Sequence, residues 1–234
     1  MPCINNNLIK VQQQIHEAAT ATGREPADIT LLAVSKTRTA DELKQAYDCG
    51  QRHFGENYLQ ESLEKIDALS ALDDLCWHFI GPIQSNKTRP IAESFHWVHS
   101  VDRIKIARRL SEQRPEHLPA LNICLQINIS GEESKAGCLP EDAATLVAEI
   151  AALPRIELRG LMAIPQATDD PEQQRDAFRR MQQLFTELKQ NHPTLDTLSM
   201  GMSGDMAMAI AEGATIVRIG TAIFGARDYS NKQN

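Results

Sequence analysis

One lysine of this sequence stands where a reactive amine is expected. Lys36 follows the apolar run LLAVS, and of the nine lysines it alone comes directly after a strongly apolar segment typical of a β-strand. A lysine that is partly desolvated and close to another cation can attack a carbonyl group and form a Schiff base. Arg38 supplies such a cation two residues further on. The position equally suits a lysine that extends along the surface or pairs with an acid.

Small and hydroxyl-bearing residues near the end of the chain form a second candidate site. Gly201 and Gly204 bracket Ser203 ahead of an expected helix, and Gly220 and Thr221 follow the run VRI. Backbone amides and hydroxyls at helix starts bind anions such as phosphate. Taken singly, Ser203 could be a helix N-cap and Gly220 a tight turn. Together, in two consecutive loops, these residues predict a phosphate site.

Arg218 bears on the identity of the ligand. A ligand that reaches both Lys36 and the phosphate site must carry an aldehyde or ketone as well as a phosphate, as pyridoxal 5′-phosphate and phosphosugars do. Arg218 lies two residues before Gly220, so its side chain could face the nitrogen of a pyridine ring. The alternative is a buried structural arginine that is paired with an acid. Both alternatives remain open at this point.

Short β-rich segments alternate with segments of helical periodicity along the chain. We expect a leading helix over residues 5–21 and eight strands at residues 29–35, 52–54, 77–80, 97–100, 122–128, 156–164, 197–200 and 215–220. Helix starts are marked by a capping box over residues 39–42 and by prolines followed by acids at 140–142 and 171–172. Such alternation predicts an α/β fold, a single (β/α)8 TIM barrel with an extra N-terminal helix. An open doubly wound sheet is the alternative.

The composition is that of an ordinary globular chain. The 234 residues are 42% hydrophobic and carry a net charge of −7, which predicts one domain over residues 1–234 in the cytoplasm. No apolar run is long enough to span a membrane, and the N-terminus lacks the pattern of a signal peptide. The acidic balance disfavours nucleic acid as the main ligand. The five cysteines are scattered without a C-x-x-C pair, so we expect neither disulfides nor a metal site.

Taken together, the motifs resemble those of one known family. AVSK at the first strand, HFGENY at the second, WHFIGPIQSNK at the third, and GLMAI, SMGMSGD and VRIGTAIFG later in the chain are similar to the pyridoxal phosphate homeostasis protein family. The resemblance covers almost the whole chain and implies a single-domain barrel similar to the N-terminal domain of alanine racemase. It also implies that pyridoxal 5′-phosphate is bound by Lys36 as a Schiff base, by Asn57 at the pocket wall, by Ser203, Gly220 and Thr221 at the phosphate, and by Arg218 at the pyridine nitrogen.

The same resemblance implies a binding protein rather than an enzyme. Racemases of this fold take a second base from a further C-terminal domain, which we do not expect here. An arginine at the pyridine nitrogen also leaves the ring a weak electron sink. We therefore expect a non-catalytic protein of intracellular vitamin B6 and amino-acid homeostasis. We expect it to be a monomer rather than a dimer, with pyridoxal-phosphate-dependent apoenzymes as recipients and no membrane partner.

Two other functions remain open from the sequence. A small racemase-like enzyme would need a second base from within the barrel, for which Tyr58, His99 and Cys124 are the candidates. An aldolase-like barrel would capture a phosphosugar on its lysine and would not need the arginine of the last strand. The sequence leaves the roles of Lys87 and Lys135, in the loops after the third and fifth strands, undetermined.

Overall fold

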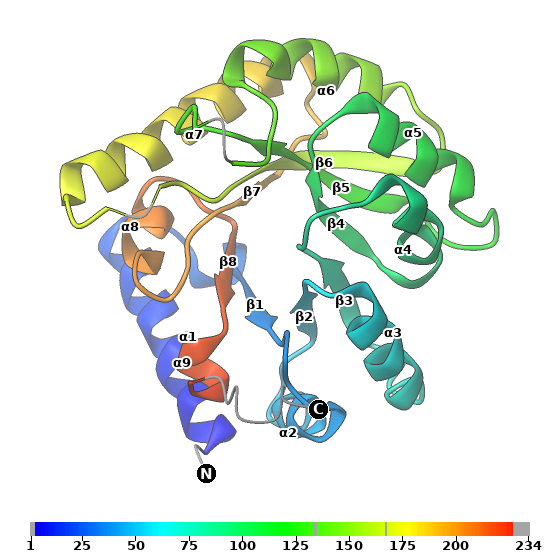
Figure 1. Ribbon diagram of the computed structural model, residues 1–234. Helices are drawn as coiled ribbons and strands as arrows, with labels where there is room; N and C mark the ends of the chain where they lie inside the picture. Colours follow the sequence, from blue (N-terminus) through cyan, green and yellow to red (C-terminus); the bar gives the residue numbers. More distant parts are fainter. Residues whose placement is uncertain (1–2, 133–134, 167, 227–234) are drawn as a thin grey trace.

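The computed structural model describes residues 3–132, 135–166 and 168–226. In this part of the chain, eight parallel strands form a closed barrel in sequence order, and β1 closes it by pairing with β8 (Figure 1). The strands are β1 (Thr30–Val34), β2 (His53–Glu56), β3 (Cys76–Phe79), β4 (Trp97–Val101), β5 (Leu121–Ile127), β6 (Ile156–Ala163), β7 (Thr197–Ser199) and β8 (Ile216–Ile219). The predicted strands and the barrel are thus confirmed, and the open sheet is wrong.

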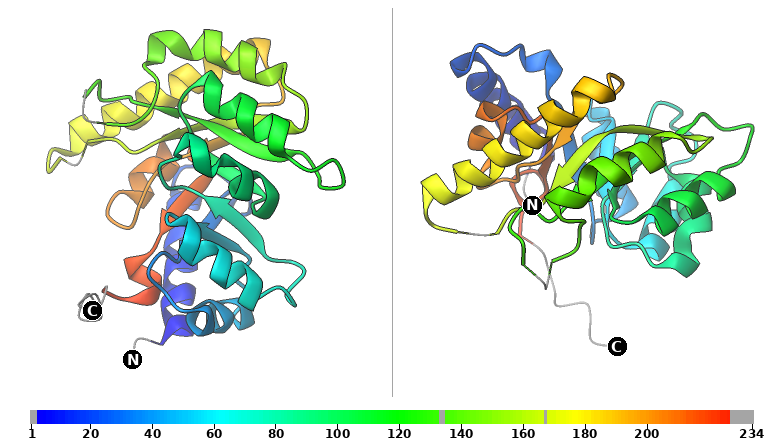
Figure 2. Two further views of the ribbon diagram at one scale, coloured as in Figure 1. Left: turned by 45° about the vertical axis from the view of Figure 1, so that its right-hand side comes forward. Right: turned by 90° about the horizontal axis from the view of Figure 1, so that it is seen from above.

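Helices follow the strands and lie on the outside of the barrel (Figures 1 and 2). They are α1 (Ile4–Ala21), α2 (Ala40–Asp48), α3 (Leu59–Ala68), α4 (Thr88–Ser94), α5 (Ile104–Gln113), α6 (Ala143–Ala151), α7 (Pro171–Asn191), α8 (Met206–Ala211) and α9 (Thr221–Phe224). Three 3-10 turns, η1 (Pro26–Asp28), η2 (Ser85–Lys87) and η3 (Pro140–Asp142), complete the connections. The predicted leading helix is α1, which precedes the first strand.

Helix α1, at the start of the chain, packs against helices α8 and α9 near its end. Its buried side chains recur at helical spacing and form one apolar stripe: Ile4, Leu8, Val11, Ile15 and Ala19. The helix contacts α8 and α9, so this stripe is covered by the C-terminal part of the fold. Asn7 donates a hydrogen bond to the carbonyl of Ile223 at 2.8 Å. The guanidinium of Arg24 donates to the carbonyls of Ile210 and Ala214 at 2.7 and 2.8 Å.

Two of the predicted helix starts are confirmed, and the third is a 3-10 turn ahead of its helix. The capping box at the start of α2 is confirmed, because Thr39 Oγ1 accepts from the Glu42 amide at 3.2 Å and the Glu42 carboxylate accepts from the Thr39 amide at 2.8 Å. Helix α7 begins at Pro171 as predicted, with Asp170 as its N-cap. The turn that starts at Pro140 is different: residues 140–142 form η3, and α6 begins only after it. A tight 3-10 turn is common at the start of an α-helix, and sequence signals do not distinguish the two.

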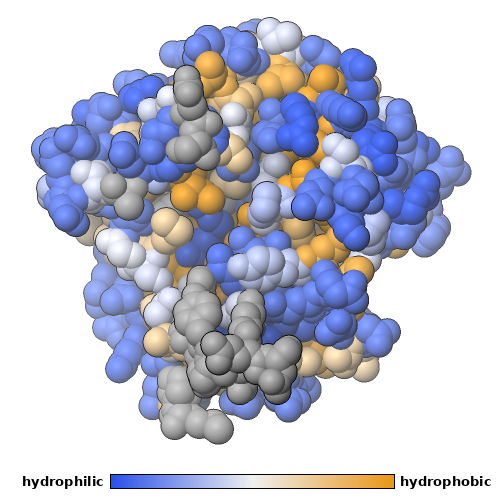
Figure 3. Space-filling model, viewed as in Figure 1, coloured by the Kyte–Doolittle hydropathy of each residue, from blue (hydrophilic) through white to orange (hydrophobic). Residues whose placement is uncertain are grey.

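The face of the molecule seen in Figure 1 is mostly polar at its surface. Figure 3 shows hydrophobic residues in small groups between hydrophilic ones. Among the helices of the described part, none has both the length and the apolar character needed to cross a membrane.

Strands β6 and β7 approach each other closely at Gly160. This residue pairs with Thr197, and a Cβ built on Gly160 would lie 1.7 Å from the Thr197 carbonyl oxygen. Two atoms cannot share that space, so any side chain at this position must push the two strands apart. Glycine is required here because the backbones are in contact.

We expect Gly160→Ala to lower the free energy of unfolding by about 3 kcal/mol or more, because the added methyl group forces the backbones of β6 and β7 apart. Gly204→Ala is the matched control, since a Cβ there meets no atom within 4 Å. The control should change stability by about 0.5 kcal/mol or less. Urea denaturation followed by circular dichroism measures both, and equal midpoints for the two variants would contradict the steric argument.

Candidate functional site

A cavity of about 320 Å³ opens where the strands end and brings the six predicted site residues together. It is lined by Lys36, Asn57, Ser203, Arg218, Gly220 and Thr221, with Val34, Arg38, Ile80, Met162, Ile164, Met202 and Gly204 completing the wall. These residues come from the carboxyl ends of β1, β2, β3, β6 and β8 and from the loop after β7. In parallel barrels this end carries the ligand site.

Lys36 lies on a short turn after β1 that is held by hydrogen bonds to β2. The turn leaves β1 at Ser35, whose amide donates to the Gly55 carbonyl of β2 at 2.9 Å and whose hydroxyl donates to the Glu56 carboxylate at 2.6 Å. Thr37 has a φ of 64°, which is an uncommon backbone conformation for a residue other than glycine. The position of the Lys36 amine therefore depends on the contacts of its two neighbours.

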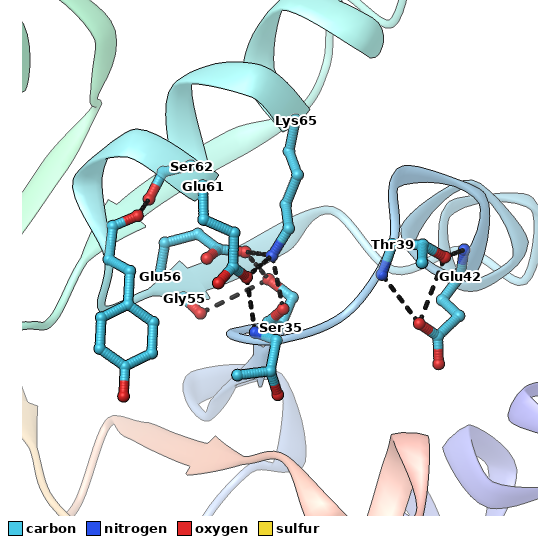
Figure 4. Close-up of polar contacts among 10 residues, drawn as sticks. Ser35, Thr39, Glu42, Gly55, Glu56, Glu61, Ser62 and Lys65 are labelled. Carbon is cyan, nitrogen blue, oxygen red and sulfur yellow. Dashed lines mark hydrogen bonds and ion pairs between the residues drawn. The ribbon is translucent and has the colours of Figure 1, made fainter. Parts of the chain in front are cut away.

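A buried ammonium holds this turn. Lys65 of α3 donates to the Ser35 carbonyl at 2.7 Å, to the Glu56 carboxylate at 2.8 Å and to the Glu61 carboxylate at 2.5 Å (Figure 4). The same Glu61 oxygen accepts from the Thr37 amide at 2.5 Å. Burial raises the pKa of the Glu56 carboxyl above its ordinary value, and the Lys65 charge acts against that rise. One cation thus joins β2 and α3 to the turn that carries Lys36.

Glu56 and Lys65 are not among the residues predicted from the sequence. A signal was present, because Lys65 lies on the face of α3 that also buries Ser62, where an unpaired ammonium would be costly. A lysine on a buried helix face indicates a buried carboxylate partner, but the sequence does not say which one. The pairing is set by how α3 lies over the turn that follows β1.

Arg218 points into the barrel and uses neutral acceptors. Its guanidinium donates to the Ser199 carbonyl at 2.7 Å, to the Ser199 hydroxyl at 2.8 Å and to the Ala163 carbonyl at 2.8 Å. Burial lowers the pKa of Arg218 to about 10, so it remains charged at neutral pH. Direct pairing of this buried arginine with an acid is not found among the described residues, because all three of these acceptors are uncharged oxygens. Among the described residues no carboxylate is hydrogen-bonded to the guanidinium, and the charge of Asp205 acts against the lowering of the Arg218 pKa.

Ser199 is itself held by a histidine. Its hydroxyl lies 2.9 Å from Nδ1 of His99, which comes from β4 across the barrel. Burial, together with the charge of Arg218, lowers the pKa of His99 to about 3, so the imidazole is neutral at neutral pH. This histidine supports the arginine through the serine and does not itself line the cavity.

The candidate anion site is formed by two loops. Gly220 is the N-cap of α9 and Thr221 is its first residue, so the first amides of this helix have no partner inside the helix. A Cβ on Gly220 would lie 3.2 Å from the Val34 carbonyl, which favours glycine here. Ser203 lies on the other loop, but α8 starts later than expected, at Met206 after Asp205. The Asp205 carboxylate accepts from the Met202 amide at 2.5 Å and so closes this loop on itself.

Asn57 lines the cavity directly after β2. Its side-chain Oδ1 is buried and has no hydrogen-bond partner within the described residues. A buried polar atom without a partner is costly, so a ligand that donates to Asn57 would remove that cost. The backbone is also crowded here, since a Cβ on Gly81 would lie 2.1 Å from the Asn57 carbonyl oxygen.

The other candidate residues either have partners of their own or lie outside the cavity. Arg38 lines the cavity, but its guanidinium donates to the Gly225 carbonyl at 2.5 Å and lies 3.4 Å from Glu42. Lys135 pairs with Glu132 at 2.9 Å, and Lys87 ends the turn η2. The lining of the cavity includes neither of these two lysines. It also includes none of the three candidate second bases Tyr58, His99 and Cys124.

Comparison with known proteins agrees with this geometry. Residues 7–228 match the family described as alanine racemase, N-terminal domain. The pyridoxal phosphate homeostasis protein of Pseudomonas aeruginosa is 60% identical over 229 residues, which cover 98% of each chain. That of Escherichia coli K12 is 54% identical over 231 residues, covering 98% of this chain and 99% of the other. The chain belongs to the pyridoxal phosphate homeostasis protein family.

Solved structures place this member of the pyridoxal phosphate homeostasis protein family among similar barrels. PipY of Synechococcus elongatus with pyridoxal phosphate bound has a TM-score of 0.77 and 40% identity, over 90% of this chain and all of that one. A protein of unknown function from Bifidobacterium adolescentis has a TM-score of 0.89 and 35% identity, over 94% of each chain. Alanine racemase of Corynebacterium glutamicum has a TM-score of 0.71 at 15% identity, over 99% of this chain and 63% of that one, which is a likeness of fold.

We expect Lys65→Met to lower the free energy of unfolding by about 3–5 kcal/mol, because it leaves the Glu56 carboxylate buried beside an apolar side chain. Lys44→Met is the control, since it breaks the exposed pair between Lys44 and Asp48 at 2.5 Å. That loss should cost about 1 kcal/mol or less. Denaturant unfolding of the two variants checks this, and a small loss in Lys65→Met would show that the buried pair does not stabilise the turn.

Proposed function

We propose that this protein binds pyridoxal 5′-phosphate at the barrel mouth and acts in intracellular vitamin B6 and amino-acid homeostasis. The observation that carries the proposal is a single cavity that holds a strand-end lysine, a charged buried arginine and a hydroxyl at a helix start: Lys36, Arg218 and Thr221. The relatives support it, because those in P. aeruginosa and E. coli are named pyridoxal phosphate homeostasis proteins and PipY has been solved with pyridoxal phosphate bound.

The residues present fit this cofactor. Lys36 would hold its aldehyde carbon as a Schiff base, and Ser203, Gly220 and Thr221 would hold its phosphate at the two loops. Asn57 offers the buried acceptor Oδ1, which a ligand can satisfy. The apolar wall formed by Val34, Ile80 and Met162 would cover the ring.

Arg218 decides how reactive the bound cofactor can be. Pyridoxal phosphate supplies an electron sink for reactions at the α-carbon of amino acids, and the sink is strongest when the pyridine nitrogen is protonated. The Arg218 guanidinium would donate a hydrogen bond to that nitrogen and keep its own protons, so the ring would stay neutral. We infer a protein that binds and releases the cofactor without strong turnover.

The candidate second bases support the same inference. His99 and Cys124 are buried inside the barrel, and Tyr58 is half exposed at the N-cap of α3. Since the cavity lining includes none of them, the described part of the chain places none of these three candidates where it could exchange a proton with a substrate in the way a racemase requires. We further propose a monomer in the cytoplasm that delivers the cofactor to pyridoxal-phosphate-dependent apoenzymes.

The attachment residue is tested by borohydride reduction of the purified protein, followed by peptide mass mapping. We expect a yellow protein and a phosphopyridoxyl mass on the peptide that contains Lys36, because reduction turns an imine into a stable secondary amine. Lys36→Ala should lose both the visible band and the label, whereas Lys10→Ala, on an exposed face of α1, should keep them. A colourless protein that pyridoxal phosphate cannot reconstitute would contradict the proposal and favour an aldolase-like barrel.

The phosphate site is tested by Thr221→Ala. A hydrogen bond to a charged group contributes about 1.5–3 kcal/mol, so the variant should bind the cofactor about 10- to 100-fold more weakly. Thr186→Ala, on the outer face of α7, should bind as the unchanged protein does. Dissociation constants from absorbance titration of the apoprotein provide the comparison. Equal affinity in both variants would place the phosphate elsewhere.

A further inference from the structure

Three metal-binding side chains meet at the floor of the barrel, opposite the cofactor cavity. His53 is the first residue of β2, and Cys76, the first residue of β3, is its partner in the strand register. His78 follows on the same face of β3. One ring nitrogen of each histidine and the Cys76 sulfur all lie within 4.8 Å of one another.

We propose that His53, Cys76 and His78 form a binding site for a transition-metal ion of the zinc class. Two imidazoles and one thiolate are the ligand types that Zn²⁺ prefers, and three protein ligands leave a fourth position for water or another ligand. The site is independent of the proposed cofactor function, because it uses none of the residues that line the cofactor cavity.

Binding requires the three ligand atoms, which lie within 4.8 Å of one another, to turn toward one point. Nδ1 of His53 and Nε2 of His78 face each other at 2.9 Å. Two nitrogens at tetrahedral positions around Zn²⁺ lie about 3.3 Å apart, so these two must separate by about 0.4 Å and both rings must turn until their lone pairs point at the ion. His78 is held in place by Trp97, whose ring is parallel to the imidazole at a centroid distance of 5.5 Å. His53 is half-buried at the barrel end and can make the movement.

An ion can reach the cluster from outside. His53 also lines a second cavity, of about 520 Å³, between α1 and the amino ends of β1 and β2. In its neutral form each imidazole has one ring nitrogen with a lone pair that can bind a metal. The proton of the hydrogen bond between His53 and His78 would move to the other nitrogen of the ring that carries it. The Cys76 thiol would lose its proton to solvent, so that binding of a divalent ion adds one positive charge and releases one proton.

His78, one of the proposed metal ligands, is hydrogen-bonded to further residues behind it. Metal-bound histidines usually donate their other ring N–H to a fixed acceptor. Nδ1 of His78 lies 2.9 Å from Nε2 of His99, and Nδ1 of His99 lies 2.9 Å from the Ser199 hydroxyl. A metal on His78 Nε2 would make Nδ1 of His78 the donor and so set the direction of this chain. The chain ends at Arg218, which donates to Ser199.

The expectation of no metal site was based on cysteine and histidine spacings along the sequence that did not include this cluster. Cys76 and His78 are two residues apart, a spacing that places both side chains on one face of a strand. His53 joins them only through the register of β2 with β3. The local pattern was therefore visible in the sequence, and its third member was not.

The test is a titration of the metal-depleted, full-length protein, without a polyhistidine tag, with Co²⁺. We expect one Co²⁺ per chain, visible absorption typical of tetrahedral cobalt, and a thiolate-to-cobalt charge-transfer band that Zn²⁺ abolishes. Cys76→Ser should lose the charge-transfer band. Cys49→Ser is the matched control, because Cys49 is also half-buried and lies outside the cluster. His53→Gln should weaken binding by about tenfold or more.

Three results would each overturn the metal site. They are the absence of a charge-transfer band in the unchanged protein, a band that persists in Cys76→Ser, and a band lost equally in Cys49→Ser. An unchanged affinity in His53→Gln would likewise remove the proposed ligand set. Thermal unfolding of each variant, followed by circular dichroism, establishes that a lost signal comes from a folded chain.

Discussion

The need to satisfy one buried arginine arranges the polar groups inside the barrel. Arg218 is 5% exposed, and a guanidinium in that position must have its donors satisfied. The acceptors come from β6 and β7, at Ala163 and Ser199, so the ends of three neighbouring strands are joined at one group. Because these acceptors are neutral, the positive charge is stabilised without being cancelled. It remains available to a ligand in the cavity.

A second buried cation organises the other side of the cavity in a different way. Lys65 is neutralised by Glu56 and Glu61, and its hydrogen bonds hold the turn that carries Lys36. The two cations thus differ: Lys65 is paired with carboxylates and supports the backbone, whereas Arg218 is bonded to neutral oxygens and lines the cavity. A cavity lined by a lysine and a buried positive charge suits a carbonyl compound that carries negative groups.

The interior of this barrel is polar along a continuous line. His53, His78, His99 and Ser199 follow one another from the floor to Arg218, each within 2.9 Å of the next. Barrels of this kind usually fill their interior with branched apolar side chains. Here neutral imidazoles replace part of that filling, which is tolerated because each ring nitrogen inside the line has a partner. A change at the floor can therefore alter the hydrogen bonding of the arginine at the mouth.

The local features of this protein follow from its sequence alone. Alternating strand and helix patterns predict a barrel, the capping box at Thr39 starts α2, and Lys36 and Thr221 stand at strand ends, because periodicity, caps and strand ends are properties of neighbouring residues. Tertiary structure decided which distant residues meet. His99 and Ser199 are 100 residues apart, and Lys65 reaches Glu56 only when α3 folds over the turn after β1. Strand register and barrel closure create these pairs, and both arise from packing over the whole chain.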